Sequence, residues 1–152
     1  MKLKPTLIAL AVSSVFTGSV QAQVFANKEA DQQIKFLNAV GAPQAWARGI
    51  TGRGVIIGVV DNGFDVNHTD IKGNVIAFTN LSATKTTIGV HGTQMASIAA
   101  GRLNNWGTVC VAPDAQLVLV QANSSISSAD GLAMSGINMA SVLKGMTWAE
   151  AQ

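Results

Sequence analysis

Charged residues, aromatic residues and cysteine are all scarce in this sequence. Of its 152 residues, 12% are charged and 5% aromatic, and there are three prolines and no tyrosine. A hydrophobic fraction of 48% excludes a disordered chain, because disorder requires low hydrophobicity and high net charge. The formal net charge of +2 also argues against nucleic-acid binding, which uses clustered Lys and Arg. The single cysteine, Cys110, excludes a disulfide within the chain, and its apolar neighbours predict a small buried side chain.

The amino-terminal residues 1–22 have the three parts of a secretory signal peptide. A basic start at residues 1–4 is followed by an apolar run at residues 6–16 and the small-residue site Val20-Gln21-Ala22. The run is too short to span a bilayer of about 30 Å, which disfavours a membrane anchor, and no later segment approaches 18 consecutive apolar residues. We therefore expect cleavage near Ala22 and export of a mature domain, residues 23–152, to the periplasm, the cell surface or the medium. That domain has eight basic and eight acidic residues.

Amino-terminal sequencing of the protein from its native host tests this prediction. The mature chain is expected to begin at Gln23, because the small-x-small site ends at Ala22. A mature chain that retains Met1 would contradict it.

Apolar runs in the mature domain predict three strands. Residues 55–60 form a continuous, mostly β-branched run, typical of a strand buried on both faces. Residues 74–78 predict a second strand, followed by a polar loop over residues 79–87. After a turn at Pro113-Asp114, residues 116–121 predict a third buried strand.

Helices are predicted on either side of these strands. Residues 31–48 indicate a helix interrupted at residues 41–43, and residues 91–101 indicate a helix of small residues with Gly101 as its C-cap. A last helix is predicted from Asp130 onward. The expected buried faces are Ile34, Leu37 and Val40 in the first helix and Met139, Val142, Met146 and Ala149 in the last.

The order of these elements predicts an α/β domain with a mainly parallel sheet flanked by helices. Three or four strands would leave a small sheet with an unpaired edge. The last helix runs on to Gln152 without a glycine or proline stop signal. We therefore expect the fold to be incomplete at the carboxyl end.

Two residues, Asp61 and His91, stand where such a fold places its chemistry. Functional side chains gather beyond the carboxyl ends of parallel strands, and Asp61 directly follows the strand at 55–60. Asn62-Gly63 behind it also suits a simple turn. His91 opens a helix at a place where Ser, Thr, Asp or Asn would be the usual cap. If the carboxylate orients the imidazole, the two should lie about 2.6–3.2 Å apart.

Four sequence blocks and a lead-in resemble the subtilases, the subtilisin-like serine proteases. The lead-in, residues 45–52, resembles A-W-x-x-G-x-T-G. The blocks are residues 54–65, 68–71, 91–101 and 111–115. They resemble the family motifs V-x-V-x-D-T-G-I/V-D, H-P-D-L, H-G-T-x-V-A-G-x-I-A-G and G-V-A-P-x-A, with Thr69 replacing the proline of the second. The resemblance extends over about residues 33–152 in the family's order.

The resemblance implies a three-layer α/β/α fold and an exported serine endopeptidase that acts on polypeptides. By the same resemblance, Asp61 is the orienting carboxylate and His91 the general base and acid of a Ser-His-Asp triad. The other histidine, His68, is implied to be structural. The chemistry implied requires no cofactor.

The serine of that triad has no counterpart in these 152 residues. The family carries it in a downstream G-T-S-M-A motif, and the oxyanion-hole asparagine would also follow Gln152. Residues 92–96 (GTQMA) look similar, but Gln94 has no hydroxyl, and Ser135 lacks the flanking Gly-Thr and comes too early. We expect the amino-terminal portion of a catalytic domain whose partner is a carboxyl-terminal remainder of the same protein. The alternative is a catalytically inactive truncated remnant or a peptide-binding module. Coding sequence beyond Gln152 that contains the motif would distinguish the two.

Two further hypotheses concern ligands. The resemblance makes Asp70 and the loop at residues 103–105 candidate calcium ligands, since calcium prefers hard oxygen atoms. The loop from Asn105 to Val111 is one residue short of the family's, however, and Asn105 also suits a turn, so no metal site is assigned. A dinucleotide site at Gly52-Arg53-Gly54 is rejected, because a phosphate-binding loop must follow a strand and these glycines precede one. The pocket-forming segments that would indicate substrate preference are absent.

Overall fold

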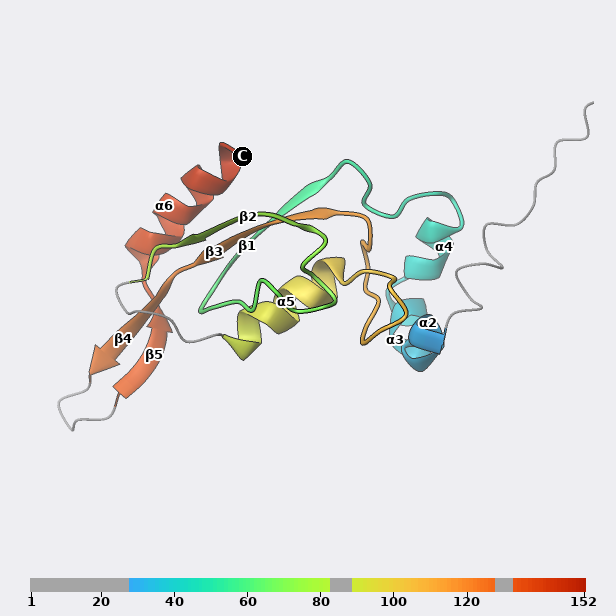
Figure 1. The fold of residues 1–152 in the computed structure, drawn as a ribbon, viewed down its shortest axis with the longest axis horizontal. Helices are drawn as coiled ribbons and strands as arrows, with labels where there is room; N and C mark the ends of the chain where they lie inside the picture. Colours follow the sequence, from blue (N-terminus) through green and yellow to red (C-terminus); the bar gives the residue numbers. More distant parts are fainter. Residues whose placement is uncertain (1–27, 83–88, 128–132) are drawn as a thin grey trace, which may run out of the picture.

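A computed structural model describes residues 28–82, 89–127 and 133–152. The expected signal peptide, most of the expected polar loop and the start of the expected last helix lie outside these residues. Three strands form a parallel sheet in the order β1 (Ile56–Asp61), β3 (Gln116–Gln121) and β2 (Val75–Asn80) (Figure 1). β3 is buried from Leu117 to Gln121 because it has a neighbour on each side. The predicted α/β class with a parallel sheet is confirmed.

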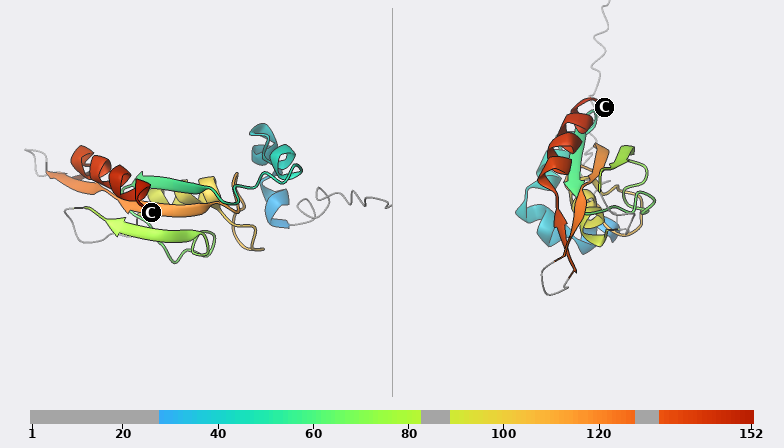
Figure 2. Two further views of the ribbon diagram at one scale, coloured as in Figure 1. Left: turned by 90° about the horizontal axis from the view of Figure 1, so that it is seen from above. Right: turned by 90° about the vertical axis from the view of Figure 1, so that its left-hand side faces the viewer.

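Helices α5 (Val90–Ala100) and α6 (Met139–Glu150) lie on opposite faces of this sheet (Figures 1 and 2). Side chains on a strand alternate between faces. Leu117 and Leu119 of β3 accordingly pack toward Ala96 and Ala100 of α5. Val120, from the other set, lies against Gly145 of α6. The three layers expected from the resemblance are therefore present.

The alanines of α5 allow it to approach the sheet closely. Ala96 and Ala100 are fully buried in one cluster with Phe64 and Ile71. Gly101 is the C-cap of α5, as predicted, although this glycine has a φ of −62° rather than the left-handed conformation. Its lack of a side chain has another reason. A Cβ would lie 2.6 Å from the carbonyl oxygen of Ser97 and 2.7 Å from that of Thr108.

Three short helices precede the sheet, where the sequence predicted one interrupted helix over residues 31–48. They are α2 (Lys28–Gln32), α3 (Ile34–Ala39) and α4 (Ala42–Trp46). Leu37 is buried with Trp46, as predicted, but Val40 is 51% exposed, so the predicted buried face of Ile34, Leu37 and Val40 is wrong at Val40. The reason is local: Val40 ends α3, and Gly41 then turns the chain in the left-handed conformation (φ 72°).

Two of the strand predictions need correction. β1 is not buried on both faces: Ile56 is 47% exposed, because β1 is an edge strand of the described sheet and α6 covers only part of it. β2 continues to Asn80, into the expected loop. The strand at 116–121 has the predicted bounds.

The predicted last helix is present, but its predicted start at Asp130 is wrong. β4 (Asn123–Ser127) and β5 (Ala133–Ile137) form an antiparallel hairpin instead, and α6 begins only after Asn138. The Asn138 side chain accepts hydrogen bonds from the amides of Ala140 and Ser141, as an N-cap does.

The predicted buried stripe of α6 is wrong in its methionines. Met139 and Met146 are 71% and 57% exposed, and Gly145 is the buried residue.

Within the described ranges, no helix combines the length and the apolarity needed to cross a membrane.

We predict that Gly145→Ala destabilises the protein. In an open helix this change stabilises by about 1 kcal/mol. Here the new Cβ would lie 2.4 Å from Cγ1 of Val120, a stiff and fully buried side chain, and such overpacking costs about 1–3 kcal/mol. Urea unfolding should show a net loss of roughly 1 kcal/mol. Gly58→Ala in β1 is the control. Its Cβ would also lie between the sheet and α6, but it would contact Ala149 of α6 at an ordinary 3.7 Å. A more stable Gly145→Ala variant would contradict the packing described.

Candidate active site

The carboxyl end of β1 places Asp61 at the edge of the sheet and buries it. Asp61 is 6% exposed, and its carbonyl oxygen accepts a hydrogen bond from the Ala122 amide (2.8 Å), which continues the pairing with β3. The amide of Asn62 donates to Oδ1 of Asp61 at 2.6 Å. The carboxylate is thus held at the point where the strand gives way to the following loop.

His91 lies in the first turn of α5 and faces this carboxylate. Its Nδ1 is 2.9 Å from both Oδ1 and Oδ2 of Asp61. The distance lies within the expected 2.6–3.2 Å, so the predicted proximity of the two side chains is confirmed. The Asp61 side chain is 8% exposed and that of His91 is 61% exposed. One ring nitrogen therefore contacts a buried carboxylate, and the imidazole as a whole remains accessible to a reactant.

Glycines allow this approach. A Cβ on Gly92 would lie 2.2 Å from the carbonyl oxygen of Gly63 and 3.0 Å from Cβ of Asp61. A Cβ on Gly89 would lie 2.5 Å from both Cα and the carbonyl oxygen of Gly63. Since real Cβ atoms do not approach so closely, any side chain at these positions would push α5 away from the loop that follows β1.

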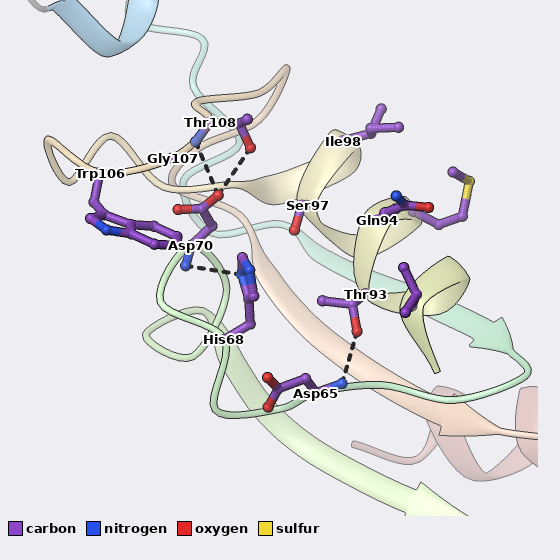
Figure 3. A pocket seen from close by; sticks show the side chains of 12 residues that line it. Asp65, His68, Asp70, Thr93, Gln94, Ser97, Ile98, Trp106, Gly107 and Thr108 are labelled. Carbon is purple, nitrogen blue, oxygen red and sulfur yellow. Dashed lines mark hydrogen bonds between the residues drawn. The ribbon is translucent and has the colours of Figure 1, made fainter. Parts of the chain in front are cut away.

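A cavity of about 760 Å³ lies between α5 and the segments that carry His68 and Trp106 (Figure 3). Its walls include Val90, Met95 and Ile98 of the helix, which are 69%, 36% and 45% exposed. His68 and Trp106 form another part of the wall, with ring centroids 5.6 Å apart in an edge-to-face arrangement. The first turn of α5 is therefore bordered by an apolar surface.

His68 does not join the Asp61–His91 pair. Its Nδ1 accepts a hydrogen bond from the amide of Asp70 at 3.4 Å, and its ring packs against Trp106. These contacts agree with the structural role that the resemblance implies. Ser135 lies in β5, where it pairs with Ser125 of β4.

Asp70 is 2% exposed and lies against the loop that follows α5. Its Oδ2 accepts hydrogen bonds from the amide and the hydroxyl of Thr108, both at 3.0 Å. Its Oδ1 is buried, and no hydrogen-bond partner for it lies among the described residues. Gly107 leaves room for the carboxylate, since a Cβ there would lie 2.6 Å from both oxygens. An anionic oxygen of this kind suits a hard cation.

Asn105 fits a cation less well. It has a left-handed backbone (φ 65°), typical of a turn, and its amide donates to Oε2 of Glu29 at 2.7 Å. The Asn104 amide donates to the same oxygen at 3.1 Å. Burial raises the pKa of the Glu29 carboxyl, and the nearby Asp70 adds to this effect. Across the described ranges, three or more His, Cys, Asp or Glu side chains nowhere gather as a metal site.

The Cys110 side chain is buried, as predicted, at 3% exposure. Burial raises the pKa of its thiol to about 11. A thiol with so high a pKa is almost entirely protonated at neutral pH, so it is a poor nucleophile.

Comparison with known proteins identifies the family. The model of the subtilase family matches residues 52–148, which include the three strands of the parallel sheet, α5 and most of α6. The chain belongs to the subtilase family. Residues 61 and 91 both fall within the match.

Its relatives include proteases from inside and outside cells. It is 33% identical over 92 residues to the major intracellular serine protease of Bacillus subtilis. The aligned residues make up 56% of this chain and 29% of that protein. It is 35% identical over 94 residues to an extracellular serine protease of Serratia marcescens, or 57% of this chain and 9% of the relative. A 31-residue segment is 48% identical to rat furin, covering 20% of this chain and 4% of furin. The chain thus spans less than a third of the length of each of these relatives.

Two residues that make contacts near the site, Glu29 and Thr93, were not predicted from the sequence. Glu29 binds the loop after α5 across 75 positions, and no motif indicates it. Thr93, in contrast, stands within the block around His91, where its side chain was not assigned any role.

Proposed function

We propose that this chain is the amino-terminal part of the catalytic domain of an exported serine endopeptidase, with Asp61 and His91 as two members of its triad. The observation that carries the proposal is the contact of His91 Nδ1 with both oxygens of the buried Asp61 carboxylate at 2.9 Å. A triad needs this arrangement, because the carboxylate selects the tautomer that carries its proton on Nδ1. Membership of the subtilase family supports the same assignment.

In the proposed mechanism, each of the two residues has one task. With Nδ1 bound to Asp61, Nε2 of His91 is the nitrogen that accepts the proton of the serine hydroxyl as that oxygen attacks the scissile carbonyl. The same nitrogen then donates the proton to the leaving amine. Asp61 stabilises the imidazolium between the two steps and is not itself protonated. Its burial favours this role, since a charge interaction is stronger in a less polar environment.

The serine is proposed to come from a carboxyl-terminal remainder of the same protein. Two observations support this: the chain spans only 29% and 9% of two of its protease relatives, and Val90, Met95 and Ile98 expose an apolar surface beside His91. An exposed apolar patch next to reactive groups is typical of a surface that other polypeptide covers. The alternative is an inactive remnant or a peptide-binding module. These 152 residues contain no G-T-S-M-A motif, and sequence beyond Gln152 that contains it would distinguish the two.

We predict that residues 23–152 alone neither cleave casein nor react with a serine-directed fluorophosphonate. A base and its orienting carboxylate cannot form an acyl-enzyme without a nucleophile. Stabilisation of the oxyanion, worth about 2.7–4 kcal/mol for one donor, is also lacking. A protein extended through a downstream G-T-S-M-A motif should cleave casein and react with the fluorophosphonate. His91→Ala in that protein should abolish proteolysis.

Fluorophosphonate labelling also distinguishes the proposed part of a serine endopeptidase from the alternative, an inactive remnant or a peptide-binding module. Labelling of the 152-residue protein that Ser135→Ala abolishes would place the nucleophile within this chain and contradict the proposal. An extended protein that folds but remains inactive would favour the peptide-binding module.

Export is part of the proposal. The relatives occur both inside and outside cells, so family membership leaves the location open. The basic start, apolar run and small-residue site of residues 1–22 support secretion.

We also propose that Asp70 helps bind a structural calcium ion together with Glu29 and the loop at residues 103–105. The buried Oδ1 of Asp70 and the two carboxylates beside this loop support the proposal. The proposed ion takes no part in the reaction. It would neutralise two neighbouring buried carboxylates and so hold the loop against the carboxyl end of α5.

Thermal unfolding with calcium or with EDTA tests this proposal. Calcium at 100 times its dissociation constant should stabilise the protein by about 2.7 kcal/mol. Asp70→Asn should remove most of that effect. Asp114→Asn should not, because Asp114 is an exposed carboxylate paired with Arg53. Equal unfolding temperatures in calcium and in EDTA would contradict the proposal.

A further inference from the structure

A single hydroxyl links the two segments that carry Asp61 and His91. Oγ1 of Thr93 donates a hydrogen bond to the carbonyl oxygen of Gly89 at 2.8 Å. Oγ1 of Thr93 also accepts a hydrogen bond from the amide of Asp65, likewise at 2.8 Å (Figure 3). Thr93 is 7% exposed, so both bonds are largely shielded from water. The hydroxyl uses its donor and an acceptor lone pair at once.

This link runs beside the contact between the two triad residues. Thr93 comes two residues after His91, and Asp65 comes four residues after Asp61. The side-chain contact of Asp61 with His91 and the hydrogen bond of Thr93 to Asp65 therefore join the same two stretches of chain, residues 61–65 and 89–93. A shift of α5 along the loop would have to break both.

The other contacts between these two stretches restrict a shift of α5 along the loop less than the Thr93 hydrogen bonds do. Gly63, Gly89 and Gly92 meet through backbone atoms, which limits how closely α5 can approach the loop. Phe64 anchors the loop in the core through apolar contacts. Such packing is non-directional, whereas a hydrogen bond weakens steeply when its angle changes. The Thr93 bonds thus supply direction that the apolar contacts lack.

We propose that Thr93 is a positioning residue that keeps Nδ1 of His91 against the Asp61 carboxylate. The inference rests on the proposed function, since it concerns the same pair. A β-branched side chain suits the task, because it restricts rotation about χ1 and so keeps the hydroxyl in one place. Valine at this position would keep the shape and lose both hydrogen bonds, and serine would keep the hydroxyl.

Exchange of the His91 Nδ1 proton with water, measured by NMR on the isotope-labelled 152-residue protein, tests the proposal. The chain has only two histidines, and His68 serves as an internal reference because its Nδ1 accepts a hydrogen bond. In Thr93→Val the exchange of the His91 proton should be about tenfold faster, the effect of losing one hydrogen bond of ordinary strength. Thr93→Ser should restore slow exchange.

Thr147→Val is the matched control. The Thr147 hydroxyl also donates to the carbonyl oxygen four residues earlier, that of Leu143, but in α6 and at an exposed position. This variant should leave the His91 proton unchanged. Unfolding experiments on all variants separate positioning from stability. If Thr93→Val lowers stability while the exchange of the His91 proton stays as in the wild type, the role is structural only and the proposal is overturned.

The wild-type protein gives a second test that needs no variant. The Asp65 amide should exchange as slowly as the amides of α5, because its partner is buried; exchange at the rate of an open loop would overturn the proposal. Failure of the proposed function looks different. In that case the wild-type His91 would have no slowly exchanging Nδ1 proton at all.

Discussion

The contact between the Asp61 carboxylate and Nδ1 of His91 depends on how closely the first turn of α5 can approach the loop after β1. Three glycines set that distance, since a Cβ on Gly89 or Gly92 would collide with Gly63. Around this point the sequence uses small residues, and the alanines further along α5 bring the rest of the helix down onto Leu117 and Leu119. The packing of the core and the geometry of the pair are therefore one constraint. A helix with larger side chains would be held further from the sheet, and its histidine further from the carboxylate.

The fold could be predicted where burial is uniform and local. β3 has the predicted bounds because this central strand has four consecutive apolar residues, Leu117 to Val120, between two glutamines, which is a strong local signal. The same kind of run misled for β1, whose neighbours in the chain do not show that it lies at an edge. The hairpin of β4 and β5 was missed because β4 is polar and serine-rich and β5 is short and contains a glycine, so neither strand shows a clear apolar alternation. Asn138 nevertheless carries the local signal for the true start of α6.

The candidate site could be predicted to a similar extent. Asp61 and His91 were found because each occupies a motif, and their proximity follows from the topology of a parallel sheet. The link from Thr93 to Asp65 and the contact of Glu29 with the loop after α5 could not be predicted, since each joins segments distant in the chain without a distinctive residue pattern. Asp70 lies between these cases: its motif indicated a ligand, and the structure shows one of its oxygens engaged by Thr108 and the other buried.

The tautomers of the two histidines test the central claim most directly. Nδ1 of His91 faces a carboxylate, so its neutral form should carry the proton on Nδ1 and leave Nε2 as the base. Nδ1 of His68 accepts a hydrogen bond from the Asp70 amide, so its proton should be on Nε2. Nitrogen-15 chemical shifts of both rings in one sample should therefore show opposite tautomers. A neutral His91 with its proton on Nε2 would contradict the account, because that nitrogen could not then accept a proton from a serine.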